Sequence, residues 1–324
     1  MEKQVMPAEW EEQSGVMLAW PEAEMDWGED TEEARVCYGE IMEEISRREK
    51  VILLRKEEVG LNDTWTRDYA PLAIRGGSKM LVDFRFDGWG GKFVASSDDA
   101  VGGKLFRQGG VFAEDVAYMR KDDVVCEGGN LDTDGQGTLL SSAICAGKRY
   151  PYLKREQWEA VFGETLGIDR TLWVEEGLLE GDDTDGHIDT LVRFADANTL
   201  LYTKCKSTDS HFAGLKRMEE QLHTFTRRDG SPYRLQSLPL PSPILHKGER
   251  LPATYANFLF INGGVLVPVY GVDEDAGALD IFRRLFPRRR IRGIDCSALL
   301  RQHGSLHCAT MQFPQGFLRD GGEA

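Results

Sequence analysis

The stretch QHGSLHCATMQ, at residues 302–312, is the part of the chain around which we expect the fold and the chemistry to be arranged. Apolar or small residues alternate with polar ones from Leu306 to Phe313. This predicts that Cys308 lies at the start of a strand, with a glycine-containing loop just before it. That position suits a nucleophile. A free cysteine is also among the most buried residue types and often serves as an apolar filler, so Cys308 alone identifies no site.

Three further stretches cluster acids, a histidine and glycines at spacings that packing does not require. They are NDTWTRD at residues 62–68, EGGN at residues 127–130 and EGDDTDGHID at residues 180–189. Brought around the thiol of Cys308, the side chains of Asp68, Glu127, His187 and Asp189 would form a pocket for a cation, with a base beside the nucleophile. These motifs therefore predict nucleophilic catalysis on a cationic substrate.

Composition is typical of a globular protein with an acidic surface. Among 324 residues there are 39 Lys and Arg against 54 Asp and Glu, which gives a formal charge of −15. This charge disfavours nucleic acid or an anionic membrane as a partner, and it weakly favours small cationic ligands. The same net charge is equally compatible with an acidic surface that serves only to keep the protein soluble.

The location of the protein is predicted from what the sequence lacks. No apolar run approaches the roughly 18 residues that a membrane-spanning helix needs. The first residues, MEKQVMP, do not form a basic segment followed by an apolar one, so no signal peptide is expected. Six cysteines are scattered without a C-x-x-C pair, which favours reduced thiols and a cytoplasmic location.

Hydrophobic periodicity predicts strands and helices that recur in turn. Strands are expected at residues 16–20, 51–54, 138–144, 191–195, 199–203, 265–270 and 291–294, and residues 82–103 read as a strand running into a long loop. Helices are expected after Asp30 with a capping box at Glu33, at residues 156–166, after a cap at Asp209 or Ser210, and around residues 279–285.

Two arrangements of these elements are compatible with the pattern. The alternation of strands and helices alone would indicate a doubly wound parallel sheet. No G-x-G-x-x-G or Walker A stretch accompanies it, however, and residues 191–203 read as a hairpin. The acidic motifs are also dispersed along the chain. These features favour several small sheets around a common centre.

The motifs closely resemble those of the agmatine deiminase (agmatine iminohydrolase) family and its relatives, the Porphyromonas-type peptidylarginine deiminases, which are guanidine-modifying enzymes. The resemblance runs almost end to end, through MPAEW at 6–10, LAWP at 18–21, residues 62–68, GWGG at 88–91, residues 127–130, residues 183–189, YANF at 255–258 and GSLHC at 304–308. It implies an α/β fold, a five-bladed α/β propeller (pentein) with pseudo-fivefold symmetry and an axial active site. It also implies one catalytic domain over residues 1–324 and a homodimer.

The resemblance also implies roles for individual residues. Matched by motif, Cys308 is the nucleophile and His187 the general acid and base, while Asp68 and Asp189 hold the guanidinium, together with Glu127. The resemblance further assigns Trp65 and Trp89 to the walls of the substrate channel and Asn257 to a position near the pocket.

This sequence departs from the family at the position four residues before His187, where many agmatine deiminases have Glu and this chain has Asp183. Asp183 is our candidate for binding the amine end of agmatine. The peptide-directed relatives place arginines after the first motif, where this chain offers Gly90 and Lys92. The segment between Leu54 and residue 62 is short for the family. A deiminase of free or C-terminal arginine is the alternative within the enzyme class.

The chemistry explains the choice of residues. A guanidinium is a flat cation whose N–H groups point outward, so two carboxylates can fix its plane and leave its central carbon open to a thiolate. A free thiol has a pKa of roughly 8.5, and nearby acids raise it. Protonated His187 and the cationic substrate must therefore lower the pKa of Cys308, which predicts a poor nucleophile in the free enzyme. A covalent thiouronium and a ureido product follow, and no metal or organic cofactor is needed.

Other readings stay open at this point. The side chains of His187, Asp189, His307 and Cys308 are all potential zinc ligands, so a metal site is one rival. A polyamine-binding module without turnover is another. His303 and His307 read as structural, and Trp65 and Trp89 would also suit a core.

Overall fold

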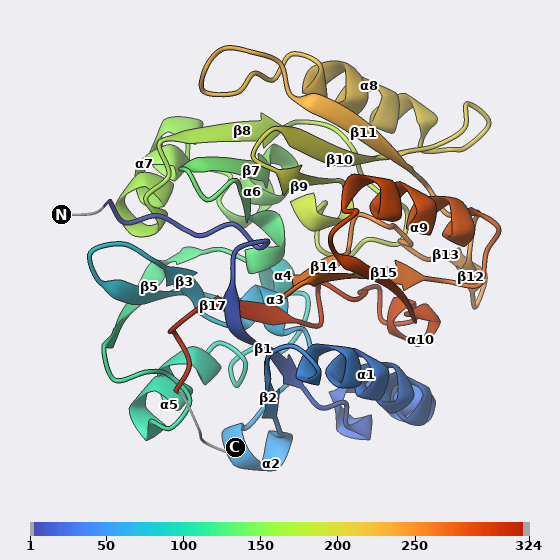
Figure 1. Cartoon of the computed structure of the whole chain (residues 1–324). Helices are drawn as coiled ribbons and strands as arrows, with labels where there is room; N and C mark the ends of the chain where they lie inside the picture. The colour runs from blue at the N-terminus through green and yellow to red at the C-terminus, as the bar shows by residue number, and fades with distance from the viewer. Residues whose placement is uncertain (1–2, 320–324) are drawn as a thin grey trace.

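The computed structural model describes residues 3–319, and it is mixed α/β, as predicted (Figure 1). Five three-stranded sheets organise this part of the chain. In strand order they are β17 (Met311–Pro314), β1 (Gln13–Ala19) and β2 (Lys50–Leu54); β3 (Leu72–Ile74), β4 (Lys79–Arg85) and β5 (Val116–Val125); β6 (Asp132–Thr133), β7 (Thr138–Ser142) and β8 (Arg170–Val174); β9 (Val192–Asp196), β10 (Thr199–Lys204) and β11 (Arg234–Pro239); and β14 (Leu259–Ile261), β15 (Gly264–Val269) and β16 (Arg290–Asp295). A short hairpin joins β12 (Leu245–His246) to β13 (Glu249–Arg250).

The five sheets share one topology. In each, the central strand pairs antiparallel with one neighbour and parallel with the other. A parallel pair needs a crossover, and a helix of at least eight residues supplies each one: α1 (Thr31–Ser46), α5 (Val101–Gln108), α7 (Arg155–Leu166), α8 (Phe212–Leu222) and α9 (Glu274–Leu285). The shorter helices are α2 (Lys56–Val59), α3 (Thr66–Tyr69), α4 (Gly88–Gly91), α6 (Ala143–Arg149) and α10 (Ser297–Leu300), with the single turns η1 (Ala23–Trp27), η2 (Gly28–Asp30), η3 (Gly128–Asn130) and η4 (Ile188–Thr190).

The arrangement of several small sheets is therefore the correct one of the two predicted, and the doubly wound parallel sheet is wrong. Each crossover returns the chain to the neighbouring strand of the same small sheet. An antiparallel pair then opens each of the next four sheets, and after β16 the strand β17 completes the first sheet beside β1. The hairpin predicted within residues 191–203 is the antiparallel pair β9–β10. The short segment after Leu54 holds the one-turn helix α2.

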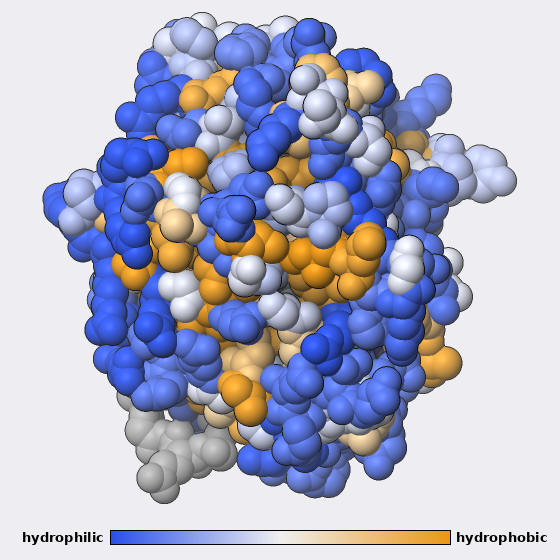
Figure 2. Space-filling view, turned by 90° about the vertical axis from the view of Figure 1, so that its right-hand side faces the viewer, coloured by the Kyte–Doolittle hydropathy of each residue, from blue (hydrophilic) through white to orange (hydrophobic). Residues whose placement is uncertain are grey.

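The helices that were expected from the sequence pack one apolar face against the sheets. Leu215, Met218 and Leu222 of α8 are buried, as is Phe282 of α9. The central strand β10 is buried along most of its length, which agrees with its continuous apolar run. The face shown in Figure 2 is mostly hydrophilic, with hydrophobic side chains gathered across its middle.

Of two predicted helix caps, the one at Asp30 is right in position but lacks the capping box, and the one at α8 is wrong. The side chain of Asp30 makes no capping hydrogen bond to α1, because Asp30 and Glu33 both form ion pairs with Arg301 from the far end of the chain. At α8, neither Asp209 nor Ser210 is the cap, since the helix begins after His211. These side chains form ion pairs or hydrogen bonds with residues that are distant in the sequence, and they do not cap the helices that the local pattern predicts.

Two predicted strand ends also differ. The strand predicted at residues 138–144 ends at Ser142, whose hydroxyl accepts a hydrogen bond from the backbone N–H of Cys145 and caps α6. Cys308 lies in a turn, and its strand, β17, begins at Met311. The glycine-containing loop before Cys308 is confirmed.

The fold brings the motifs together by repeating one position. Asp68, Glu127, Asp189, Asn257 and Cys308 each lie no more than five residues before the outer antiparallel strand of a different sheet, namely β3, β6, β9, β14 and β17. Each of the five sheets therefore contributes one side chain from the same end of the same strand.

Candidate active site

Cys308 is buried beside two polar side chains. Its Sγ lies 3.3 Å from Nδ2 of Asn257 and 3.8 Å from Oδ2 of Asp189. Oδ1 of Asn257 accepts hydrogen bonds from the backbone N–H groups of His307, at 2.9 Å, and of Cys308, at 3.3 Å. The amide of Asn257 therefore fixes the turn that carries the thiol.

Burial raises the pKa of the Cys308 thiol well above its usual value, and the carboxylates of Asp189 and Asp68 raise it further. An isolated thiolate would be poorly solvated here and would face two like charges. The electrostatics of the substrate-free site therefore favour the neutral thiol.

The glycine of the turn before Cys308 is required by a close approach. A Cβ atom at Gly304 would lie 2.3 Å from a ring atom of Trp65. The indole of Trp65 thus packs directly against the backbone of the loop, and it also contacts the ring of Trp27 at a centroid distance of 5.8 Å.

Cys308 opens onto a cavity of about 390 Å³. Its walls are formed by Asp26, Asp63, Trp65, Asp68, Trp89, Phe93, Asp183, Thr184, Arg301, Gln302, His303, Gly304 and Cys308. The predicted residues Trp65, Trp89 and Asp183 thus share one cavity with Asp68 and the thiol. A larger hollow of about 900 Å³ is lined by residues of β11 and α9, and its lining within residues 3–319 includes Cys205 but no histidine.

Both oxygens of Asp68 are held by donors. The backbone N–H of Gly129 donates to Oδ1 at 2.8 Å, and the indole N–H of Trp89 donates to Oδ2 at 2.9 Å. A Cβ atom at Gly129 would lie 2.5 Å from Nδ1 of His187 and 2.8 Å from Oδ1 of Asp68. Glycine at this position therefore allows His187 and Asp68 to approach each other.

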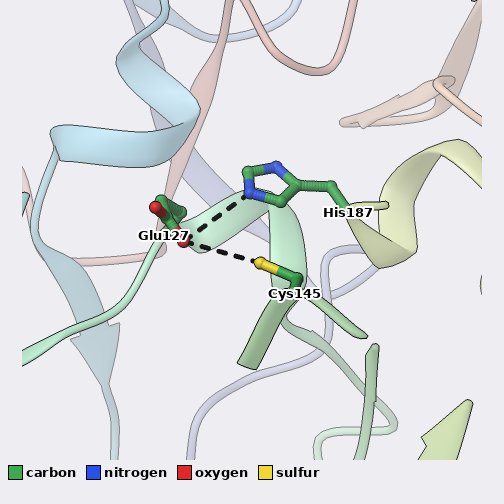
Figure 3. A group of neighbouring side chains, drawn as sticks. All are labelled: Glu127, Cys145 and His187. Carbon is green, nitrogen blue, oxygen red and sulfur yellow. Dashed lines mark hydrogen bonds and ion pairs between the residues drawn. The ribbon is translucent and has the colours of Figure 1, made fainter. Parts of the chain in front are cut away.

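His187 lies between two acids and is fully buried. Its Nδ1 is 3.6 Å from Oδ1 of Asp68, and its Nε2 is 3.7 Å from Oε2 of Glu127 (Figure 3). Burial alone would lower the pKa of His187, but Asp68, Cys145 and Glu127 raise it well above its usual value. The imidazole is thus set up as a cation, which can donate a proton.

Glu127 is held as an anion. Burial would raise the pKa of Glu127, but the neighbouring His187 and Arg149 lower it. Arg149 forms an ion pair with Oε1 of Glu127 and also contacts Asp185 at 2.8 Å. Oε2 of Glu127 remains turned toward His187.

Asp189 is anchored from behind by a buried chain of polar groups. Its Oδ2 lies 2.8 Å from Nδ1 of His307, and Nε2 of His307 lies 2.7 Å from Oε2 of Glu9, which in turn pairs with Arg193 at 2.8 Å. Burial raises the pKa of Asp189, but His307, His187 and Arg193 together lower it below its usual value. Oδ1 of Asp189 is buried and has no hydrogen-bond partner among the residues that the structure describes, so an acceptor is left for a ligand.

The predicted residues fall into two contacting groups, and both reach the cavity. Cys308, Asn257 and Asp189 form one group, and Asp68, His187 and Glu127 form the other. The sequence predicts a structural role for His307, and its contacts to Asp189 and Glu9 are those of a residue that positions Asp189.

Sequence reasoning missed five residues. Asp26 and Asp63 line the cavity, Glu9 and Arg193 support His307, and Cys145 contacts Glu127. Glu9 and Asp63 do lie within motifs that the resemblance rests on, which is the signal that could have found them. Cys145 has no such signal.

The zinc ligands suggested from the sequence do not form one group. Within residues 3–319, the group of His, Cys, Asp and Glu side chains whose ligating atoms all lie within 4.8 Å of one another is Glu127, Cys145 and His187.

A search of residues 3–319 for an apolar helix with the length of a membrane span finds none.

Comparisons with known proteins identify relatives over most of the chain. The family model of Porphyromonas-type peptidyl-arginine deiminase matches residues 5–314. Agmatine deiminase of Stutzerimonas stutzeri is 29% identical, with 97% of this chain and 96% of the relative covered. The structure of C. jejuni agmatine deiminase with substrate bound has a TM-score of 0.89 at 34% identity, covering 98% of this chain and 97% of the other. A Porphyromonas gingivalis protein provisionally assigned as an arginine deiminase has a TM-score of 0.93 at 42% identity, covering 98% and 100%.

A fold of small α/β sheets with a buried thiol, an imidazole and paired carboxylates defines a hydrolase of carbon–nitrogen bonds in amidine-type groups. The match over residues 5–314 makes the assignment more specific: this chain belongs to the Porphyromonas-type peptidyl-arginine deiminase family. The resemblance noted in the sequence is thereby confirmed.

Proposed function

We propose that this protein is an agmatine deiminase, which hydrolyses agmatine to N-carbamoylputrescine and ammonia. The observation that carries the proposal is the position of the Cys308 thiol, 3.8 Å from Asp189, at a cavity whose walls include four aspartates. Such a cavity suits a substrate with two positive charges. The solved agmatine deiminase with substrate bound supports the same conclusion.

The chemistry assigns one role to each side chain. The guanidinium lies between Asp68 and Asp189, and Oδ1 of Asp189 is already free to accept its N–H groups. As the cation binds, Cys308 releases its proton to solvent, and its sulfur attacks the central carbon. His187 then donates a proton to the leaving ammonia, while the thiouronium remains on the sulfur.

The second half of the reaction uses the same groups. His187, now neutral, takes a proton from water, and the resulting hydroxide adds to the thiouronium carbon. The carbon–sulfur bond breaks, the proton of the added hydroxyl passes to solvent, where the released ammonia takes it up, and the ureido product leaves with the thiolate of Cys308 restored. Glu127 keeps the imidazole oriented throughout, and Asn257 holds the turn of Cys308 in place. No step requires a metal or an organic cofactor.

The far wall of the cavity favours agmatine over arginine. Asp26, Asp63 and Asp183 lie together in this wall. Burial and the neighbouring Asp98, Asp26 and Asp183 raise the pKa of Asp63 well above its usual value. A ligand ammonium would relieve this repulsion. An arginine carboxylate would instead need a free cation, and Arg301 already pairs with Asp30 and Glu33.

We also propose that residues 1–324 form one catalytic domain in which the five sheets are the blades of a propeller. The shared strand order and the contribution of one site residue from the start of each sheet support a pseudo-fivefold axis through the site. A homodimer and a cytoplasmic location belong to the same proposal. The six free cysteines agree with a reducing compartment.

The test is a colorimetric assay for ureido product with agmatine, arginine and a short peptide ending in arginine. We expect turnover of agmatine and little of the other two. Cys308→Ser should lower kcat by at least about a thousandfold, since a nucleophile is lost. Cys205→Ser, at a cysteine outside the cavity, is the control and should leave kcat unchanged.

Preference for arginine or the peptide would overturn the substrate assignment and favour the arginine-directed alternative. Binding of agmatine without any ureido product would identify a polyamine-binding protein instead. Full activity in Cys308→Ser would exclude the mechanism.

A further inference from the structure

Cys145 contacts the proposed catalytic residues without a role in the reaction. It lies in α6, is 1% exposed, and directs its Sγ at Oε2 of Glu127, 3.7 Å away (Figure 3). The same oxygen lies 3.7 Å from Nε2 of His187. A thiol, an imidazole and a carboxylate oxygen thus converge, and their ligating atoms all lie within 4.8 Å of one another.

The geometry of this triangle fits a tetrahedral metal ion. Zinc is bound at about 2.3 Å by sulfur, about 2.0–2.1 Å by imidazole nitrogen and about 2.0–2.2 Å by carboxylate oxygen. Three ligands about 2.2 Å from one ion in their plane are separated by about 3.8 Å, and by less when the ion lies out of that plane. Oε2 of Glu127 lies 3.7 Å from Sγ of Cys145 and 3.7 Å from Nε2 of His187, and both distances are close to this separation.

A second observation points to a ligand at the same place. Both ring nitrogens of His187 are buried and have no hydrogen-bond partner within residues 3–319, although buried polar atoms are normally paired. Arg149 holds Oε1 of Glu127, which leaves Oε2 for another partner. Nε2 of His187 is aimed at that oxygen (Figure 3).

The set of donors selects the kind of ion. Thiolate and imidazole suit zinc and similar borderline-soft metals, whereas magnesium and calcium prefer oxygen ligands alone. Three protein ligands also leave a fourth position for water.

We propose that Glu127, Cys145 and His187 bind Zn²⁺ and that this ion inhibits the enzyme reversibly. Binding displaces the thiol proton of Cys145 and the proton on Nε2 of His187 to solvent, and it forms one metal–sulfur, one metal–nitrogen and one metal–oxygen bond. The metal then replaces the proton on Nε2 of His187, so this imidazole can no longer donate a proton to the leaving ammonia. The inhibition rests on the proposed function, whereas the metal site does not.

Co²⁺ tests the site without any use of activity, because a cobalt–thiolate bond has a strong charge-transfer absorption in the near ultraviolet. We expect the whole protein to bind one Co²⁺ with this band and Zn²⁺ to displace it. Cys308→Ala should keep the band, and Cys145→Ala and Cys145→Ser should lose it. Cys126→Ala is the matched control, since this buried cysteine lies next to Glu127 but outside the group, and it should keep the band.

Activity provides the second measurement. Micromolar Zn²⁺ should inhibit agmatine hydrolysis by the wild type and a chelator should restore it, while Cys145→Ala should need at least tenfold more Zn²⁺ for the same inhibition. Thermal melts without metal confirm that the Cys145 variants fold. A band that survives in Cys145→Ala and disappears in Cys308→Ala would show that the metal binds to Cys308, and it would overturn the proposal. Absence of any band in the wild type would overturn it too, whereas absence of agmatine turnover would overturn only the proposed function.

Discussion

The indole N–H of Trp89 donates a hydrogen bond of 2.9 Å to Oδ2 of Asp68. The backbone of Trp89 is left-handed, with φ of 59°, between the glycines Gly88 and Gly90. A bulky residue adopts this conformation only when its surroundings require it. The GWGG motif therefore serves to deliver the indole nitrogen to the carboxylate that we assign to the guanidinium.

Trp89→Phe removes this donor and keeps an aromatic ring in the wall. Because a hydrogen bond to a charged group contributes about 1.5–3 kcal/mol, we expect kcat/KM for agmatine to fall by about tenfold to a hundredfold. Steady-state kinetics provide the measurement. Phe93→Leu changes the neighbouring wall, where the ring of Phe93 contacts that of Trp89 at a centroid distance of 5.5 Å, and should have a smaller effect. Unchanged kinetics in Trp89→Phe would show that the hydrogen bond does not orient Asp68.

Cys308 should react slowly as a free thiol. Its pKa is raised by burial and by Asp189 and Asp68, so the neutral form dominates at pH 7. We expect alkylation by iodoacetamide to be slow at pH 7 and to accelerate as pH rises. Asp189→Asn removes a negative charge beside the sulfur, so its thiol should be alkylated faster at pH 7 even though deimination is lost. A fully formed thiolate in the wild type at pH 7 would contradict this account, and Cys308→Ser identifies the background from other cysteines.

Asp183 should make agmatine binding depend on pH. Burial and the nearby Asp182 raise the pKa of its carboxyl to about 6, although His303 and Lys92 act in the opposite direction. Below about 6 the carboxyl is neutral and binds an ammonium weakly; above it the carboxylate forms an ion pair. We therefore expect KM for agmatine to fall as pH rises through about 6.

The same side chain provides the control for that prediction. Asp183→Asn should raise KM by about tenfold or more, as expected for a lost charged hydrogen bond, and should remove the pH dependence near 6. If the dependence persisted in Asp183→Asn, the amine end would bind at another acid of the wall, such as Asp63.

Gly129 should tolerate no side chain. A methyl group there would lie 2.5 Å from Nδ1 of His187, so Gly129→Ala must push the imidazole and Asp68 apart. A displacement of about 1 Å at a reacting group costs about a hundredfold in rate, and we expect kcat to fall by at least that amount. Gly147→Ala, in α6 with nothing within 4 Å of the added carbon, is the control and should raise stability by about 0.5–1 kcal/mol. Equal effects of the two changes in activity assays and thermal melts would exclude a specific role for Gly129.

The motifs predict that Asp68, Glu127, His187 and Asp189 surround the thiol of Cys308, and of these four Asp189 is the one that contacts its sulfur within residues 3–319. Cys308, Asp189 and Asn257 contact one another, and His187 contacts both Asp68 and Glu127, because each motif occupies the same position relative to its own sheet. Periodicity could not predict the sheets themselves. It reports which face of a strand is buried, but not whether the next strand lies beside it or opens a new sheet.

Residues outside the motifs were missed for a related reason. Cys145 reaches Glu127 only because Ser142 ends β7 early and starts α6, which turns the thiol inward. Arg301 removed the predicted cap of α1 by pairing with Asp30. The position of Cys145 and the pairing of Arg301 both depend on contacts between distant parts of the chain, which local sequence patterns cannot predict.

The placement of β17 has a consequence for how activity arises during synthesis. This strand pairs with β1, so residues near the two ends of the chain lie side by side in one sheet, and Cys308 comes just before it. A nascent polypeptide has neither its sulfur nucleophile nor the antiparallel partner of β1 until residues 308–314 have been synthesised. Proteolytic cleavage before Cys308 likewise separates the thiol from the rest of the pocket, so fragments of this protein would be inert instead of partly active.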